Sequence, residues 1–178
     1  MTDENRIDEL IAGLRQGPME VRRAATAELG ASGEAAVEPL ITAMRVSDND
    51  VRWYAARALV QIGKPAVDPL LAAMRAEEDR DFRRYAMAAL TGIGDAAVEP
   101  LIGVIEDADQ DLLPLAAMAL CKIGDPAVEP LLRLMHHPNP EMQERAALLL
   151  WKMGEPGAGP LTEALEESRR ANRSANNK

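Results

Sequence analysis

The segment Gly63-Lys64-Pro65-Ala66-Val67-Asp68-Pro69-Leu70 decides the fold, because the chain repeats it. Three further copies begin at Gly33, Gly94 and Gly124, and a degenerate copy begins at Gly154. The five glycines are therefore 30, 31, 30 and 30 residues apart. Self-similarity at a fixed period of this length is the sequence signature of a repeat protein.

A second block lies upstream of each glycine and keeps the same register. Twelve residues before the glycines stand Val21, Val51, Phe82, Leu112 and Met142. Four residues later stand Ala25, Ala55, Ala86, Ala116 and Ala146. Eight residues later stand Leu29, Leu59, Leu90, Leu120 and Leu150. Apolar residues at such offsets form a helical stripe, whereas a strand would alternate by two.

Polar residues mark the start of this first helix. Asp48, Asp79, Asp109 and Asn139 stand three residues before the stripe, where they serve as N-caps. The repeated glycine predicts a left-handed stop at the end of the helix. A methyl group at each repeated alanine allows the partner helix to approach closely, and a larger side chain there would overpack the contact.

The quoted segment begins a second helix in each repeat. Val67, Leu70, Leu71 and Met74 stand at offsets of 0, 3, 4 and 7. The repeated proline fits if each second helix starts one to three residues earlier, since a first-turn proline loses no helical hydrogen bond. A short connection makes the two helices antiparallel neighbours. The sequence therefore predicts an all-α fold of stacked antiparallel helix pairs.

The ends of the chain fit the same pattern. Residues 7–11 align with residues 37–41, which predicts an N-terminal capping helix at about 4–16. Five units are expected, at about 17–46, 47–77, 78–107, 108–137 and 138–167, so that residues 1–167 form a single repeat domain. Residues 168–178 carry three arginines and a lysine but no apolar stripe, and we expect a disordered basic tail there.

Composition narrows the classes of protein. The 178 residues are 47% apolar but only 3% aromatic, which favours alanine-rich helical packing over a β-sandwich. The net charge of −9 disfavours nucleic-acid binding. A single cysteine excludes an internal disulfide, and neither a membrane-spanning apolar run nor a secretory signal is visible. We expect a soluble, cytoplasmic protein without a membrane role.

The pattern Val-Arg-x-x-Ala…Leu…Ile-Gly-x-x-Ala-Val-x-Pro-Leu resembles HEAT repeats, and more narrowly the short HEAT-like subfamily named for the phycobilisome lyases. The resemblance covers about residues 4–167. It implies a right-handed α-solenoid with first helices on the convex side and second helices on the concave side. Members mostly act as protein-binding scaffolds, although bilin lyases and deoxyhypusine hydroxylase share the repeat.

Residues that could carry catalysis are few. Deoxyhypusine hydroxylase holds two irons with several His-Glu pairs, but this chain has only His136 and His137 and no His-Glu dipeptide. Adjacent helical residues diverge, and we interpret the two histidines as a solvated helix end. Cys121 has no neighbouring histidine or asparagine, and a half-buried thiol is the simpler interpretation. The sequence predicts no catalytic residue, no cofactor site and no metal site.

A bilin-handling protein is the alternative function. A bilin requires carboxylates for its pyrrole N–H groups and basic groups for its propionates. Glu99, Glu129, Arg45 and Arg75 are candidates for these contacts, yet they are also ordinary surface residues of such a repeat.

The main functional hypothesis is protein binding through exposed positions of the second helices. Three and six residues after each proline, residues differ between units and face away from the apolar stripe. The candidate binding residues are Thr42, Arg45, Ala72, Arg75, Gly103, Glu106, Arg133 and His136. The variation fits a surface selected for binding and equally fits neutral drift. The corresponding residues of the last unit are Glu163 and Glu166, so charge changes sign along the array.

Two further features concern the first helices. Arg22, Arg52 and Arg83 follow the first stripe residue in three successive units, either as a ladder with Asp50 and Asp81 between units or as a phosphate site. Trp53 and Leu113 depart from the repeat pattern, and Pro114 should delay the start of its helix. We predict a secondary contact there, which would permit a homodimer. The main partner is expected to be an unidentified protein or peptide.

Overall fold

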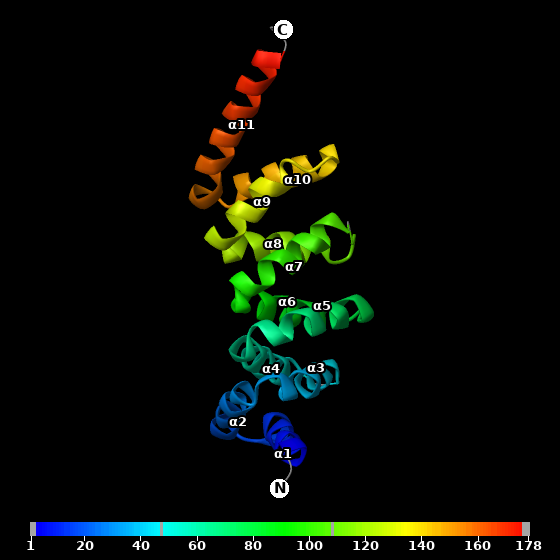
Figure 1. Ribbon diagram of the computed structural model, residues 1–178. Helices are drawn as coiled ribbons and strands as arrows, with labels where there is room; N and C mark the ends of the chain where they lie inside the picture. Colours follow the sequence, from blue (N-terminus) through cyan, green and yellow to red (C-terminus); the bar gives the residue numbers. More distant parts are fainter. Residues whose placement is uncertain (1–2, 47, 108, 176–178) are drawn as a thin grey trace. The chain divides into compact units, whose positions relative to one another are not determined.

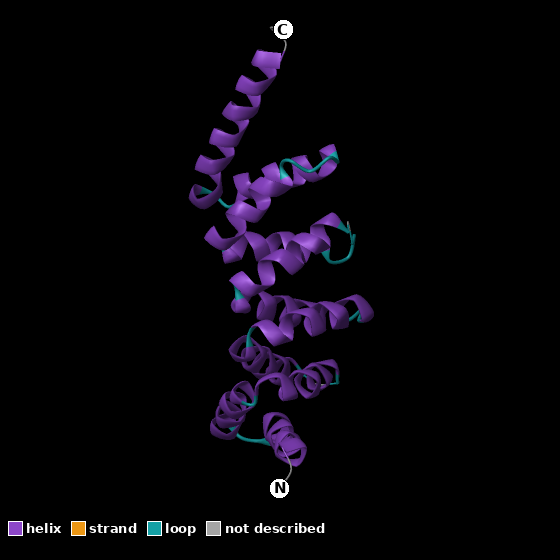
Figure 2. Cartoon of the chain, viewed as in Figure 1, coloured by secondary structure: helices purple, strands orange, loops and turns teal. Residues whose placement is uncertain are grey.

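The computed structural model describes residues 3–46, 48–107 and 109–175, and every regular element in these ranges is a helix (Figures 1 and 2). The chain divides into two compact units, Met1–Pro100 and Leu101–Lys178, with the boundary inside α7 (Asp95–Glu106). The predicted unit starts at residues 47 and 108 and the last tail residues, 176–178, lie outside the described residues. The predicted all-α fold of stacked helix pairs is confirmed.

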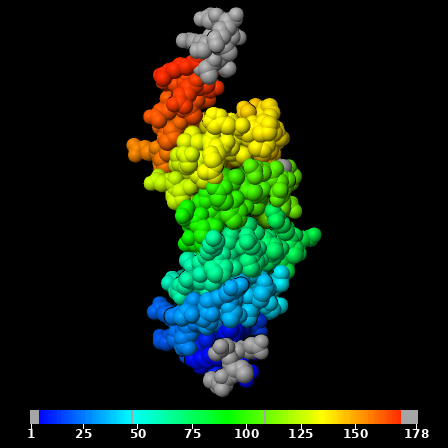
Figure 3. Space-filling view, viewed as in Figure 1, coloured from blue at the N-terminus to red at the C-terminus, as the bar shows by residue number. Residues whose placement is uncertain are grey.

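Two series of helices run side by side in the first unit (Figure 1). The first helices are α2 (Met19–Ala31), α4 (Asn49–Ile62) and α6 (Arg80–Ile93). The second helices are α1 (Asp3–Gln16), α3 (Val37–Arg45) and α5 (Val67–Ala76), of which the last two follow the 3₁₀ turns η1 (Gly33–Ala36) and η2 (Lys64–Ala66). Each second helix packs mainly against the first helix that follows it in the chain. The helices appear as successive bands in the space-filling view of this unit (Figure 3).

The second unit contains the end of α7 and four more α-helices. They are α8 (Leu113–Ile123), α9 (Val128–Leu134), α10 (Pro140–Lys152) and α11 (Glu155–Ala175), with the 3₁₀ turn η3 (Asp125–Ala127) before α9. Helix α9 packs against α10, and α11 contacts both.

The repeated apolar positions form the core. The five repeated alanines and the five repeated leucines are all buried. Val21 is the exception among the first stripe residues, since 44% of it is exposed, whereas its counterparts Val51, Phe82, Leu112 and Met142 are at most 3% exposed. The capping helix α1 buries one face through Ile7, Leu10, Ile11 and Leu14.

The predicted N-caps Asp48, Asp79 and Asn139 are confirmed at the starts of α4, α6 and α10. The Asp48 carboxylate accepts from the Val51 N–H at 3.0 Å, the Asp79 carboxylate accepts from the N–H groups of Asp81 and Phe82, and Asn139 accepts from the Glu141 N–H. Asp109 accepts from the N–H groups of Asp111 and Leu112, but the prediction that it caps the helix is wrong, because α8 begins only at Leu113 and its N-cap is Leu112. These bonds satisfy donors that a helix start leaves unpaired.

The glycines at the ends of the first helices have positive φ, but three of them are not in the left-handed helical conformation that we expected. Gly63, Gly94 and Gly124 have φ of 76° to 78° and ψ near −130°. A side chain is excluded there even more strictly than in the left-handed helical region. Only glycine can therefore make this turn between the two helices.

The prolines occupy the third residue of α3, α5 and α9, as predicted. In α7 and α11 the helix begins five residues before Pro100 and Pro160, so these two lie deeper in their helices. Pro114 has the predicted effect, because α8 begins only at Leu113, whereas α4 begins two residues before Val51.

The predicted tail differs from expectation, because α11 continues as a helix to Ala175. The lack of an apolar stripe correctly indicates that residues 168–170 do not pack, since all three are exposed. It does not exclude a helix, and an Arg170–Glu166 ion pair at 3.2 Å, four residues apart, supports the helical conformation there.

Gly157 allows α11 to approach α10 closely. It replaces an alanine that is fully buried in the earlier repeats, at Ala36, Ala66, Ala97 and Ala127. A Cβ atom at Gly157 would lie only 2.1 Å from the Leu150 carbonyl oxygen. The last helix therefore packs closer to its neighbour than the repeat would otherwise allow.

We predict that Gly157→Ala destabilises the protein by about 1–3 kcal/mol, because the clash with backbone outweighs the roughly 1 kcal/mol by which alanine favours a helix. Gly103→Ala is the matched control: it lies inside α7 with no atom within 4 Å of the added methyl group, and it should stabilise. Urea unfolding of both variants measures the difference. If Gly157→Ala raised the free energy of unfolding as much as Gly103→Ala, the close approach of α11 to α10 at Gly157 would be contradicted.

Candidate functional site

The predicted binding residues of the first unit lie together on one exposed face. Thr42 and Arg45 are on α3, Ala72 and Arg75 are on the adjacent α5, and all four are exposed. The Arg45 Nε donates to Glu77 Oε1 at 2.9 Å. This ion pair ties the end of α3 to the end of α5, and with both side chains about one-third exposed it contributes about 0–1 kcal/mol.

The other four predicted residues lie in the second unit. Glu106, Arg133 and His136 are exposed, whereas Gly103 is half-buried. A groove of about 260 Å³ runs between α9 and α11, with Glu129, Arg133 and His136 on the α9 side and Glu163 and Glu167 on the α11 side. The groove thus contains both basic and acidic side chains, an arrangement suited to a partner that carries both charges.

The histidines form a helix end rather than a ligand pair. The N–H of His136 donates to the Arg133 carbonyl, and the His137 Nδ1 accepts from the N–H of Asn139 at 3.1 Å. Within the described ranges, no three side chains of His, Cys, Asp or Glu gather in a way that could hold a metal ion.

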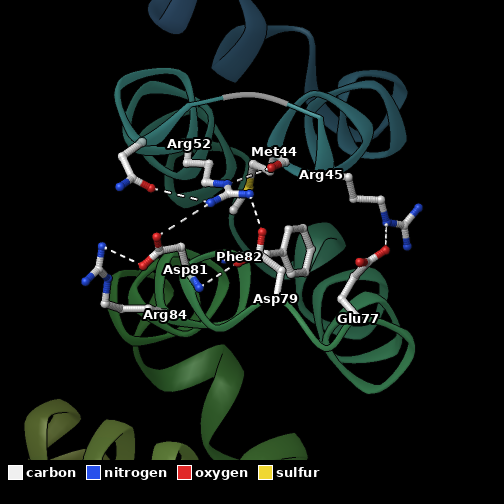
Figure 4. A network of polar contacts seen from close by, with 9 residues as sticks. Met44, Arg45, Arg52, Glu77, Asp79, Asp81, Phe82 and Arg84 are labelled. Atoms are coloured by element: carbon white, nitrogen blue, oxygen red, sulfur yellow. Dashed lines mark hydrogen bonds and ion pairs between the residues drawn. The ribbon is translucent and has the colours of Figure 1, made fainter.

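Arg52, near the start of α4, connects the end of α3 with the start of α6 in the first unit (Figure 4). Its Nε donates to the Met44 carbonyl at 2.9 Å, at the end of α3. Its Nη2 meets the Asp79 carboxylate at 2.5 Å, and its Nη1 lies 4.0 Å from Asp81 at the start of α6. Only 7% of Arg52 is exposed, so these contacts replace the water that its charge has lost.

We call the contacts of Arg52 with Met44, Asp79 and Asp81 a joint. Arg22 and Arg83 form parts of the same joint in their own repeats. Arg22 donates to the Gly17 carbonyl at 2.9 Å and lies 3.5 Å from the Asp50 carboxylate. Arg83 donates from Nε to the Met74 carbonyl at 3.1 Å. The ladder between units is therefore confirmed for Arg22 and Arg52. Their guanidinium groups are engaged inside the protein, which argues against a phosphate site.

Asp79 combines a helix cap with an ion pair. Hydrogen bonds from the Phe82 and Asp81 N–H groups and the contact with Arg52 stabilise its charged form, so the pKa of Asp79 lies below its usual value. Partial burial opposes this effect and does not reverse it.

The fourth repeat lacks the arginine, and a different residue replaces its contact. Leu113 stands at the position of Arg52, and Ile105 stands at the position of Met44. The Ile105 carbonyl instead accepts from Nη1 of Arg145, 40 residues later on α10, at 3.1 Å. The sequence reasoning missed this role of Arg145, since the substitution at Leu113 signals only that a donor is lost.

An apolar groove of about 610 Å³ lies beside this replacement, between α8 and α10. Leu113 is half-buried in its wall, and this is the placement of the predicted secondary contact in the second unit. Met118 and Leu148 also line the groove and are 65% and 50% exposed. The sequence analysis did not single them out, because an apolar residue on the solvent side of one helix is common.

Trp53 is the other predicted secondary contact, and 44% of it is exposed. Its ring meets Tyr54 edge-on at 4.8 Å, and the Arg57 guanidinium lies 4.8 Å above it. Hollows of about 430 and 420 Å³ lie against this pair of aromatic rings. Trp53 is thus held by its neighbours and still presents one side to solvent.

Cys121 behaves as a structural thiol. It is half-buried, and burial raises the pKa of the Cys121 thiol, with a smaller opposing effect from the Lys152 ammonium group. A thiol that stays protonated is a poor nucleophile.

The candidate bilin contacts gain no support from the structure. Arg45, Arg75 and Glu99 belong to the first unit and Glu129 to the second, and Arg45 is already paired with Glu77. Among the residues that were searched, no helix is both long and apolar enough to cross a membrane.

We predict that the stability difference between the wild type and Asp79→Asn depends on pH. Asparagine keeps the cap but removes the charge. Because the folded-state pKa is lowered, the charge stabilises the wild type at neutral pH, and this advantage is lost as the pH falls below about 4 and through the folded pKa. Thermal unfolding between pH 7 and 3 measures it.

Asp48→Asn is the control for this experiment, because Asp48 caps α4 and is not among the carboxylates paired with Arg22 or Arg52. Its difference from the wild type should stay small throughout. A pH-independent effect of Asp79→Asn would show that the charge of Asp79, which the Phe82 N–H and Arg52 stabilise, does not contribute to the stability.

A comparison with models of protein families agrees with the repeat. A family model described as HEAT repeats matches residues 7–91, 67–139 and 98–176. None of the curated proteins compared with the chain matches it. Among solved structures, an engineered protein is 21% identical, with 93% of this chain and 87% of that chain covered and a TM-score of 0.36.

A designed armadillo repeat protein in complex with the peptide (KR)4 is 18% identical, with 90% of this chain and 91% of that chain covered and a TM-score of 0.36. The three matched ranges together cover residues 7–176, most of the sequence. The chain belongs to the HEAT repeat family.

Proposed function

We propose that this HEAT-repeat chain is a non-catalytic scaffold that binds a protein or peptide through the exposed face of its second helices. In a HEAT superhelix this is the concave face. The observation that supports the proposal is a contrast within the second helices. Positions that repeat between units, such as Leu40, Met44, Leu70 and Met74, are fully buried, whereas the positions that vary are exposed or half-buried.

The chemistry of this face supports a partner that carries both charges. In the first unit, Arg45 and Arg75 give α3 and α5 a basic surface. In the second unit, the groove between α9 and α11 is lined by Arg133 and His136 and also by acidic residues, among them Glu163 and Glu167. Small residues at Ala72 and Gly103 leave space for a partner side chain. Such complementarity adds specificity and speeds association more than it adds affinity.

The proposal extends to the type of repeat and to the location of the protein. The repeat period of 30 residues supports a single domain of short, lyase-type HEAT repeats over residues 1–167. A cytoplasmic location fits a chain whose only cysteine is free.

The test is the charge-reversed variant Arg45→Glu/Arg75→Glu, used as bait in affinity purification with quantitative mass spectrometry. A partner of this face should be captured at least about tenfold less well, because attraction is exchanged for repulsion. The control variant Arg23→Glu/Lys64→Glu carries the same net charge, and both of its sites are exposed and outside this face, since Arg23 lies on the first helix α2 and Lys64 in the turn η2. Unchanged capture by the first variant would count against the second-helix face.

A further inference from the structure

The groove between α8 and α10 is a second candidate for binding, on the first helices rather than the second. It differs from the rest of the array because α8 begins late, at Leu113, and because the joint formed by Arg52 in the earlier repeat is missing there. In the first unit, α2, α4 and α6 pack against one another extensively, whereas α8 and α10 contact less. The gap between them is the groove.

The lining of this groove is apolar. Its walls are formed mainly by Leu113, Pro114, Ala117, Met118, Leu148 and Leu149. Met118 and Leu148 are at least half exposed, so the groove presents large apolar groups to water. Methionine adapts to differently shaped ligands, and such a groove between helices is a recognised receptor for an amphipathic helix.

The charged residues at the groove are all basic. Arg145 is engaged by the Ile105 carbonyl and by Glu141, but Lys122 and Lys152 form no ion pair with a described residue. The two lysines lie in the last turns of α8 and α10. Both lysines lie at the same end of the groove. Cys121 is the neighbour of Lys122 in the sequence, and its Sγ lies 4.0 Å from the Leu149 carbonyl oxygen on α10. Burial raises the pKa of the Cys121 thiol, and the charge of Lys152 acts in the opposite direction and lowers it.

We propose that this groove docks an acidic amphipathic helix of a partner protein. Large apolar side chains on one face of that helix enter the groove, and carboxylates at its edge meet Lys122 and Lys152. The lysines supply the charge complementarity, in a chain whose net charge is −9. Helix α8 has 11 residues, a length of about 16 Å, so about three turns of a partner helix match it.

Two other occupants fit the groove less well. A fatty acid lying in it would leave the exposed sides of Met118 and Leu148 in water. A second copy of the chain would have to offer an acidic helix with several exposed apolar groups. In the acidic part of α11 only Leu165, 43% exposed, is a large exposed apolar residue within the described ranges. The inference uses a different surface from the second-helix face and does not depend on it.

The experiment uses a fluorescein-labelled synthetic peptide of three to four helical turns, with leucine at positions i, i+3, i+4 and i+7 and mostly glutamate elsewhere. A second peptide has lysine in place of glutamate. Fluorescence anisotropy measures the binding of each to the full chain. The wild type should bind the acidic peptide and discriminate against the basic one.

Two variants alter the groove, and each has a matched control. Leu148→Ser and Lys122→Glu/Lys152→Glu should weaken binding of the acidic peptide by about tenfold or more. Leu165→Ser and Arg15→Glu/Lys64→Glu should change it less than about twofold, because these exposed residues do not line the groove. The lysine reversal should also shift the preference toward the basic peptide.

Four outcomes would overturn the proposal. The first is that the wild type does not bind the acidic peptide, and the second is that the control variants lose as much affinity for the peptide as the groove variants do. The third is that a fluorescent fatty acid binds and the peptide does not displace it. The fourth is that the chain forms a dimer which Leu148→Ser abolishes and which the peptide does not dissociate. Circular dichroism and thermal unfolding verify that each variant is folded. If Leu148→Ser does not fold, the Lys122→Glu/Lys152→Glu variant tests the proposal by itself, because both lysines are exposed and their substitution should not disturb the core.

Discussion

A buried guanidinium group holds the repeats of the first unit in register. Arg52 binds the last turn of α3 through the Met44 carbonyl and the first turn of α6 through Asp79, while its own helix α4 lies between them. A hydrogen bond to a charged group contributes about 1.5–3 kcal/mol, more than an exposed ion pair does. Because a buried charge without partners is costly, the joint also excludes other spacings of these helices. The stacking of α4 on α6, and with it the exposed face of α3 and α5, depends on this arrangement.

The fourth repeat shows what happens without this joint. The Leu113 side chain has no hydrogen-bond donor, and the Ile105 carbonyl accepts instead from Arg145 of the next repeat. That contact satisfies the Ile105 carbonyl near the end of α7, and the Arg145 side chain lines the groove between α8 and α10. Together with the delayed start of α8 at Leu113, it leaves an apolar groove where the earlier repeats have packed helices. A repeat protein tolerates such a local change because each unit contacts only its neighbours.

Much of the fold follows from the repeat period, because the same residues recur where the packing requires them. The helix starts at Asp48 and Asp79, the positions of the turns at Gly63 and Gly94 and the buried alanines were all predictable at the level of single residues. The conformation of these two glycines differs from the left-handed helical one that we expected. The exposed second-helix positions were predictable, since they are the positions that the repeat leaves free to vary. Two further predictions that differed concern neighbours. Val21 is exposed although its position is otherwise buried, and α11 remains helical beyond the last packed residue.

The sequence by itself determined the helices, their order, the stripe that each buries and the glycine turns, because these depend on residues a few positions apart. Only the tertiary structure decided which donor reaches the Ile105 carbonyl, that Lys122 and Lys152 share one end of a groove, and that Gly157 allows α11 to approach Leu150. Each of these contacts joins residues from different helices, and its geometry depends on where helix ends lie in space. A repeated pattern specifies the average unit, whereas a binding surface arises from the positions at which one unit departs from it.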